Sequence, residues 1–433
     1  MEISESLYTL LAFLFGAILA AVANYLADRW GWTLRYRSPW RRFARVDLKT
    51  SYPKRAFFDY IPIVGQLALA RFALKRPTLK GRAVDYSTIP GWESRYFWLR
   101  GFATEALFAI LLAMRWLYWR EALGVPDAVA IWLVESSFFW FLLVASLIDL
   151  DDYIIPDVVT IVGTLTALAV AYFGARFVLI VPTDFPNDWH MVSTTPFFTE
   201  WISTLASRLL GFSSSIVTIA PFFLIWTFWC FALLDRRFYL RLGLRRALAL
   251  FWRRLFRSRL TIYVGVIWAL GLCALYWISR SDLDALNSFV AVNTLALALI
   301  GLFFGVVLIW TVRLVGGTAL GMEAMGFGDV ILAGVIGAYL GWQGVLVVFF
   351  IAPFFGLFFG LLRRGFQADR EIPYGPFLAL GSLVYMVWRE KFNELLAPLF
   401  GDLVFLATLG GGGLTLFVIL LTALRIVREL RAR

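Results

Sequence analysis

Two acidic clusters are the residues of this sequence best suited to chemistry. One is Asp149-Leu-Asp-Asp-Tyr-Ile-Ile-Pro-Asp157, and the other is Gly326-Phe-Gly-Asp329. When two carboxyl groups lie within a few ångströms, one keeps its proton and the pair titrates as a unit. The ionised member can then take a proton from water, while the protonated member polarises a peptide carbonyl. We therefore expect aspartic-protease chemistry, with Asp149 and Asp329 as the catalytic pair.

The residues beside the two aspartates support this interpretation. Glycine at 326 and 328 lets the backbone approach Asp329 without intervening side chains. Pro156 predicts the end of a loop and the first turn of a helix. The dipole of that helix would favour an anion at Asp157.

Further acids leave alternatives open. Asp151 and Asp152 could each take the role assigned to Asp149. Glu323 lies six residues before Asp329, where it could bias the pair by like-charge repulsion, orient a substrate amine, or be a solvated loop acid. Acids at helix ends can also be merely solvated or paired with loop arginines, and neither cluster alone predicts catalysis.

The composition is that of a polytopic membrane protein. The 433 residues are 61% hydrophobic, 18% aromatic and 16% charged, with a mean hydropathy of +0.77, whereas soluble domains are less apolar and more charged. The net charge of +11 is explained by basic cytoplasmic loops, and we expect no nucleic-acid partner.

Apolar runs predict an all-α fold with about eleven transmembrane helices. Each run is close to the roughly 20 residues that span a bilayer, although two are shorter. The predicted spans are 8–26, 101–119, 128–148, 158–180, 214–234, 260–279, 288–312, 329–342, 344–362, 376–389 and 403–424. We interpret the first as a retained helix, because it lacks a preceding basic region and a small-residue cleavage site.

Loop charge predicts the orientation of these spans. Residues 29–100 carry sixteen Arg and Lys against four acids, and residues 235–259 carry nine against one, whereas residues 181–213 carry one against three. The positive-inside rule then places the N-terminus outside and the C-terminus inside. Both acidic clusters fall on the cytoplasmic side under this topology.

Cysteine and histidine usage argues against several other active sites. Cys230 and Cys273 lie apart within apolar runs, and His190 is the single histidine. This pattern predicts neither a zinc site nor a disulfide framework. We expect no metal.

The acidic motifs resemble those of the type IV prepilin peptidases, bacterial inner-membrane aspartic proteases of the GxGD class. The segments that carry the resemblance are Ile148–Asp157, Gly326–Asp329, Gly337–Trp342 and Ile372–Pro376, and weaker similarities are Phe15–Asn24, Asp59–Pro62, Ser94–Tyr96 and Thr104–Glu105. Together they cover roughly residues 8–180 and 288–390. The resemblance implies that Asp149 and Asp329 are the two catalytic aspartates.

It also implies a substrate and a second activity. Family members remove the basic leader from prepilins and pseudopilins at the cytoplasmic face of the membrane, without a cofactor. Many also methylate the new N-terminus with S-adenosylmethionine, through the N-terminal cytoplasmic loop. Asp59 and Glu105 could belong to such a methyl-transfer site, or could be structural.

The sequence departs from the family pattern in four places. Residues 29–100 contain no cysteine, where the family often has two Cys-x-x-Cys pairs. Asp152 replaces a common histidine, and Ile331 replaces a common lysine. Asp329 follows Asp149 by 180 residues, and we attribute the surplus to an insertion with two added spans.

These observations predict five regions. They are a methyltransferase-like region (1–120), the first part of a peptidase core with Asp149 (121–180), the inserted region (181–287), the second part of the core with Asp329 (288–390) and an extra C-terminal helix (391–433). Two other functions stay open. A transporter would spread its acids along a pathway, and a catalytically inactive scaffold would have lost an aspartate or the glycines.

Overall fold

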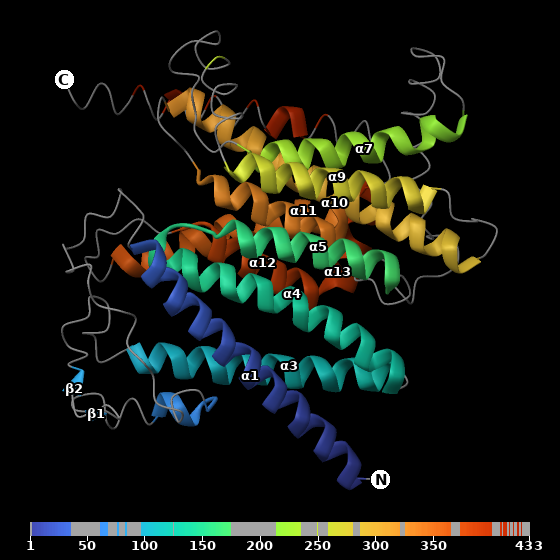
Figure 1. Cartoon of the computed structure of the whole chain (residues 1–433). Helices are drawn as coiled ribbons and strands as arrows, with labels where there is room; N and C mark the ends of the chain where they lie inside the picture. Colours follow the sequence, from blue (N-terminus) through green and yellow to red (C-terminus); the bar gives the residue numbers. More distant parts are fainter. Residues whose placement is uncertain are drawn as a thin grey trace. The chain divides into compact units, whose positions relative to one another are not determined.

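The described part of the chain is built almost wholly from helices (Figure 1). A computed structural model describes residues 2–35, 61–67, 76–77, 83–84, 97–123, 125–174, 214–234, 259–279, 286–320, 325–364 and 373–400, with single positions at 249 and between 408 and 426. The helices are α1 (Glu2–Arg35), α3 (Phe97–Ala122), α4 (Val125–Asp152), α5 (Asp157–Phe173), α7 (Ser214–Ala232), α9 (Arg259–Ser279), α10 (Leu286–Leu320), α11 (Phe327–Arg364), α12 (Gly375–Val387) and α13 (Arg389–Phe400). Two short strands, β1 (Arg76–Pro77) and β2 (Ala83–Val84), pair antiparallel.

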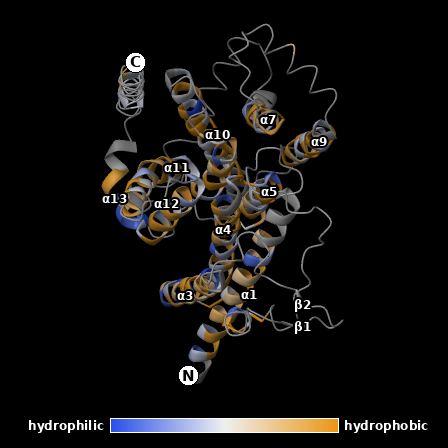
Figure 2. Cartoon of the chain, turned by 90° about the vertical axis from the view of Figure 1, so that its left-hand side faces the viewer, coloured by the Kyte–Doolittle hydropathy of each residue, from blue (hydrophilic) through white to orange (hydrophobic). Residues whose placement is uncertain are grey.

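Six of the described helices are long and apolar enough to cross a membrane. Their apolar stretches are Glu5–Ala27, Leu99–Ala122, Val125–Leu150, Thr261–Ile278, Thr294–Thr318 and Phe327–Leu362. Parts of α5, α7 and α12 form shorter apolar helices, and apolar residues run along the described helices in Figure 2. This confirms an all-α, polytopic membrane protein. The count of eleven spans and the orientation remain predictions, and the predicted span 403–424 lies largely outside the described residues.

The chain divides into two compact units, Met1–Val159 and Thr160–Arg433. In the first unit, α1 packs against α3 and α4. Small residues make this packing close: a Cβ atom added to Gly16 would lie 2.9 Å from the Cα atom of Ala109. Near the end of α4, Leu147 and Ile148 pack with Ala23 and Ala27 of α1 in a buried cluster. The residues just before Asp149 are therefore anchored in the core of this unit.

A buried carboxylate joins α1, α3 and the segment 61–67. Glu105 is 1% exposed, and its Oε1 accepts hydrogen bonds from Asn24 Nδ2 at 3.0 Å and Gln66 Nε2 at 2.9 Å. Its Oε2 accepts the backbone N–H of Ile63 at 2.6 Å. Asn24 also donates to the carbonyl of Gly101 at 3.2 Å. Asn24 is thus a helix-packing polar residue that joins α1 to α3.

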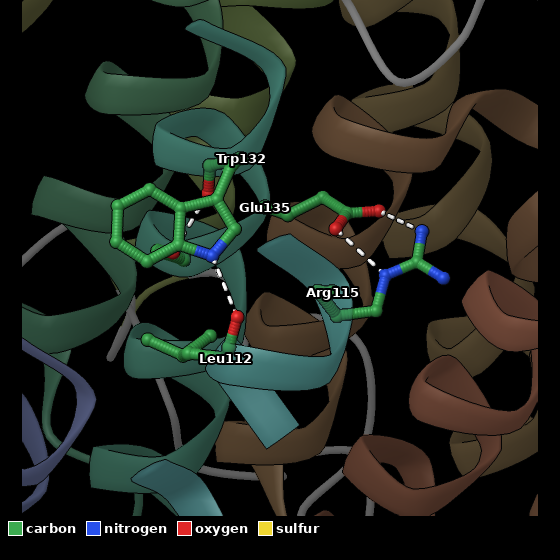
Figure 3. A network of polar contacts seen from close by, with 5 residues as sticks. Leu112, Arg115, Trp132 and Glu135 are labelled. Carbon is green, nitrogen blue, oxygen red and sulfur yellow. Dashed lines mark hydrogen bonds and ion pairs between the residues drawn. The ribbon is translucent and has the colours of Figure 1, made fainter. Parts of the chain in front are cut away.

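A buried ion pair joins α3 to α4 (Figure 3). Arg115 donates from Nε to Glu135 Oε2 at 2.9 Å and from Nη2 to Oε1 at 2.6 Å. The Glu135 side chain is fully buried. Nearby, Trp132 donates its indole N–H to the carbonyl of Leu112 at 2.8 Å. Because a lone charge is expensive within a membrane, this pairing fixes how α3 and α4 face each other.

Glycines bring α10 and α11 into backbone contact in the second unit. A Cβ atom added to Gly301 would lie 2.0 Å from the carbonyl oxygen of Gly337, and one added to Gly305 would lie 2.2 Å from that of Ala333. Small residues spaced four apart permit such close crossings between membrane helices. Ala333 lies one helical turn after Asp329. The contact of Ala333 with Gly305 therefore fixes the position of Asp329 along the axis of α10.

Helix α11 is broken at Gly341, which has φ 75° and ψ 177°. A positive φ is costly for residues with a Cβ atom, which explains glycine at this position. The break lies at the junction of the predicted spans 329–342 and 344–362, and separate membrane crossings by these two segments remain a prediction. Helix α12 packs against α11.

The predicted insertion includes α7 and α9, which pack against each other. Trp226 donates its indole N–H to the carbonyl of Trp268, and Trp268 donates its own to Thr227 Oγ1, both at 3.0 Å. Phe228 of α7 contacts Phe303 of α10.

Candidate active site

Asp329 lies in the first turn of α11 and is only 6% exposed. The unpaired N–H groups and the dipole of a helix N-terminus favour a negative charge at this position. A Cβ atom added to Gly326 would lie 3.3 Å from Asp329 Oδ2. Because this contact would be tight, glycine at 326 leaves the space that the carboxyl group occupies.

Arg313 of α10 holds the turn that leads to Asp329. Its Nε donates to the carbonyl of Met325 at 3.0 Å, and its guanidinium carbon lies 5.3 Å from the centre of the Phe327 ring. Arg313 is 5% exposed. A buried cation therefore contacts both residues that flank Gly326.

Tyr374 approaches Asp329 from the start of α12. It precedes the first residue of that helix, Gly375, and its ring meets that of Phe377 edge to face. Burial, and to a lesser degree the negative charge of Asp329, raise the pKa of the Tyr374 hydroxyl. The phenol is therefore protonated at neutral pH, and the start of α12 lies near Asp329.

Asp149 lies in the last turn of α4 and is 5% exposed. The N–H group of Tyr153 donates to the carbonyl of Asp149 at 2.9 Å. Tyr153 has φ 56°, a left-handed conformation typical of residues that end a helix. Asp149 thus lies near the C-terminal end of a buried helix.

Pro156 and Asp157 have the local structure that the sequence predicts. Helix α5 begins at Asp157, which therefore lies in its first turn. Pro156 precedes it, and the carbonyl of Pro156 accepts the N–H group of Val159 at 3.1 Å.

The remaining candidates are only partly described. Asp151 belongs to α4, but its side chain lies outside the described residues, as does Glu323 entirely. Asp149 is in the first unit and Asp329 is in the second. Gly326, Gly328 and Asp329 are brought together locally, and the pairing of Asp149 with Asp329 stays a prediction.

Comparison with known proteins identifies the relatives of this chain. A segment of 139 residues is 31% identical to the prepilin leader peptidase/N-methyltransferase of Burkholderia pseudomallei. Segments of 100 residues are 32% and 30% identical to the proteins of that name from Aeromonas hydrophila and Pseudomonas aeruginosa. The resemblance to the type IV prepilin peptidases is confirmed.

These matches cover part of each protein. They span 22% to 31% of this chain and 34% to 41% of the three relatives. The chain therefore matches well under half of the length of these prepilin peptidases. No protein-family model matches the chain, and no solved structure matches it significantly.

Two residues near the Asp329 turn were not predicted from the sequence: Arg313, which contacts Met325 and Phe327, and Tyr374. Arg313 is the one charged residue in the sequence of α10, and a charge within a membrane helix indicates a functional or structural role. Composition alone therefore gave a signal for Arg313. Tyr374 gave a weaker one, because its contact with Asp329 depends on how α12 packs against α11.

Proposed function

We propose that this chain is a membrane aspartic endopeptidase that removes the leader peptide of prepilins or pseudopilins. The proposal is carried by one observation: each of the two acidic motifs contains a buried aspartate at a helix end, Asp149 and Asp329. Burying an ionisable carboxyl group is costly in such surroundings. That cost is accepted where the carboxyl groups perform chemistry.

The two helix ends assign different protonation states to the pair. Asp329 lies at a helix N-terminus, which favours the anion, whereas Asp149 lies in the last turn of α4, where carbonyl groups disfavour one. We assign the shared proton to Asp149 in the resting enzyme. The neutral Tyr374 phenol and the Arg313 cation near the Asp329 turn favour the same distribution.

Hydrolysis then proceeds by general acid–base catalysis. Asp329 takes a proton from the attacking water, while Asp149 donates its proton to the carbonyl oxygen of the scissile peptide bond. The tetrahedral intermediate collapses when the leaving amine receives a proton from Asp329. Asp149 recovers its own proton from the reforming carboxyl product, and no covalent enzyme intermediate forms. The reaction needs no cofactor.

The proposed setting is the cytoplasmic face of the bacterial inner membrane. The predicted topology, with the N-terminus outside and the C-terminus inside, puts both acidic clusters on that face. The positively charged leader of a prepilin would remain on the same side. Pilus assembly and type II secretion are the systems that use such substrates.

Methylation with S-adenosylmethionine stays a separate proposal without a described site. Asp59 lies outside the described residues. Glu105 is 1% exposed and accepts N–H groups from Asn24, Gln66 and Ile63. This saturated carboxylate does not fit a cofactor ligand, and we derive no methyl-transfer step from it.

The proposal is tested by leader cleavage of a prepilin encoded in the same genome. Wild type, Asp149→Asn and Asp329→Asn are co-expressed with the substrate, and leader loss is followed by mass spectrometry. We expect cleavage by wild type alone, with all three proteins inserted in the membrane. Cleavage by an Asn variant would reassign that aspartate, with Asp151 next for position 149. No cleavage of any prepilin by wild type would favour the inactive-scaffold alternative.

A further inference from the structure

Arg313 is a buried cation in α10. It is 5% exposed and is the one charged residue among the 35 residues of the helix. Burying a guanidinium group is costly unless it is paired or hydrogen-bonded. Its partners therefore indicate what the charge is for.

Two of these partners flank the glycine that makes room for Asp329. The Met325 carbonyl accepts the Arg313 Nε–H at 3.0 Å, and the Phe327 ring lies 5.3 Å from the guanidinium carbon. Gly326 lies between these two residues in the chain. A Cβ atom added to it would lie 3.3 Å from Asp329 Oδ2. One side chain thus holds the backbone on one side of Gly326 and the aromatic ring on the other.

The chemistry of arginine suits this task better than that of lysine. A guanidinium group is planar, presents N–H donors in fixed directions and stacks on aromatic rings. It can therefore donate to a carbonyl and lie against a ring at once. A lysine ammonium would supply the charge without this fixed geometry.

We propose that Arg313 is a positioning residue for Asp329, because it fixes the turn Met325–Gly328 from which the carboxyl group projects. The proposal rests on the proposed catalytic function of Asp329. Arg313 acts through the turn and touches no substrate. Its loss should therefore lower kcat and leave KM unchanged, and a misplacement of about 1 Å at a catalytic group costs on the order of 10²-fold in rate.

The test compares Arg313→Met and Arg313→Lys with wild type in detergent micelles. We expect kcat for prepilin cleavage to fall about 10²-fold for Arg313→Met, with unchanged KM and with partial recovery in Arg313→Lys. The matched control is Arg115→Met, which removes an arginine of similar burial from the first unit. It should lower the thermal midpoint while the folded protein keeps its kcat.

Hydrogen–deuterium exchange makes the result independent of activity. The amides of the peptide that contains residues 325–329 should exchange faster in Arg313→Met than in wild type, and those of α4 should not change. Unchanged exchange, or an unchanged kcat in a cleaving protein, overturns the role of Arg313. Wild type and Asp329→Asn could prove equally inactive while the exchange of residues 325–329 still rises in Arg313→Met. That result would contradict the peptidase function but support the role of Arg313 in fixing the turn Met325–Gly328.

Discussion

Replacing Gly305 by alanine should displace Asp329 by way of the backbone of α11. The added Cβ atom would lie 2.2 Å from the carbonyl oxygen of Ala333, and ordinary van der Waals contact begins near 3.4 Å. The two helices must therefore separate by about 1.2 Å at this point. Since Ala333 follows Asp329 by one turn, the aspartate moves with it.

The expected cost follows from that displacement. Overpacking of this kind costs about 1–3 kcal/mol, and we expect the upper part of that range because the obstacle is backbone. A shift of about 1 Å at a catalytic group should lower the cleavage rate on the order of 10²-fold. Thermal unfolding in detergent and prepilin cleavage by the purified protein measure the two effects.

Gly360 of α11 provides the matched control. A Cβ atom added there meets nothing within 4 Å, so Gly360→Ala should leave the cleavage rate unchanged. It should not lower the thermal midpoint, since alanine is favoured over glycine in a helix by about 0.5–1 kcal/mol. The reasoning is refuted if Gly305→Ala matches Gly360→Ala in both assays.

Three other predictions concern burial, charge and backbone conformation. Glu135→Ala should lower the free energy of unfolding by about 3–5 kcal/mol, because it leaves Arg115 buried without its carboxylate partner. The double variant Arg115→Met/Glu135→Leu should recover most of this loss in chemical denaturation. A double variant whose loss equals the sum of the two single losses would contradict this prediction. The ultraviolet difference titration between wild type and Tyr374→Phe should show one phenol that ionises above the ordinary tyrosine pKa of about 10. Asp329→Asn should lower the pKa of Tyr374 only in part, because burial is the larger cause of the shift. An ordinary pKa for Tyr374 in wild type would refute the burial argument. Gly341→Ala should lose about 1–2 kcal/mol at its positive φ, and a thermal midpoint equal to that of wild type would be evidence against the break.

The local structure around both aspartates followed from the sequence because it depends on nearby residues. Pro156 predicted where α5 begins, and Asp157 lies in its first turn. The sequence predicted separate spans 329–342 and 344–362, and α11 is broken at Gly341, close to their junction.

The contacts between distant segments could not be derived in the same way. Arg313 and Met325 meet because α10 and α11 cross at glycines, and the crossing depends on the positions of two whole helices. The ion pair of Arg115 with Glu135 also depends on how α3 faces α4. Composition signals that such charges need partners, but it does not say which partners they take.

The central claim is that Asp149 and Asp329 act as one pair, and cross-linking tests it most directly. Cys230 and Cys273 are the two cysteines of the chain, so their replacement by serine gives a background for the double variant Asp149→Cys/Asp329→Cys. A short thiol-specific cross-linker should join these positions in membranes, and a site-specific protease cut between them should leave the fragments linked. Asp149→Cys/Leu340→Cys is the control, because Leu340 lies roughly 16 Å from Asp329 along the part of α11 that precedes the break at Gly341. Linkage of the aspartate positions alone supports the pair, and equal absence of linkage in both variants contradicts it.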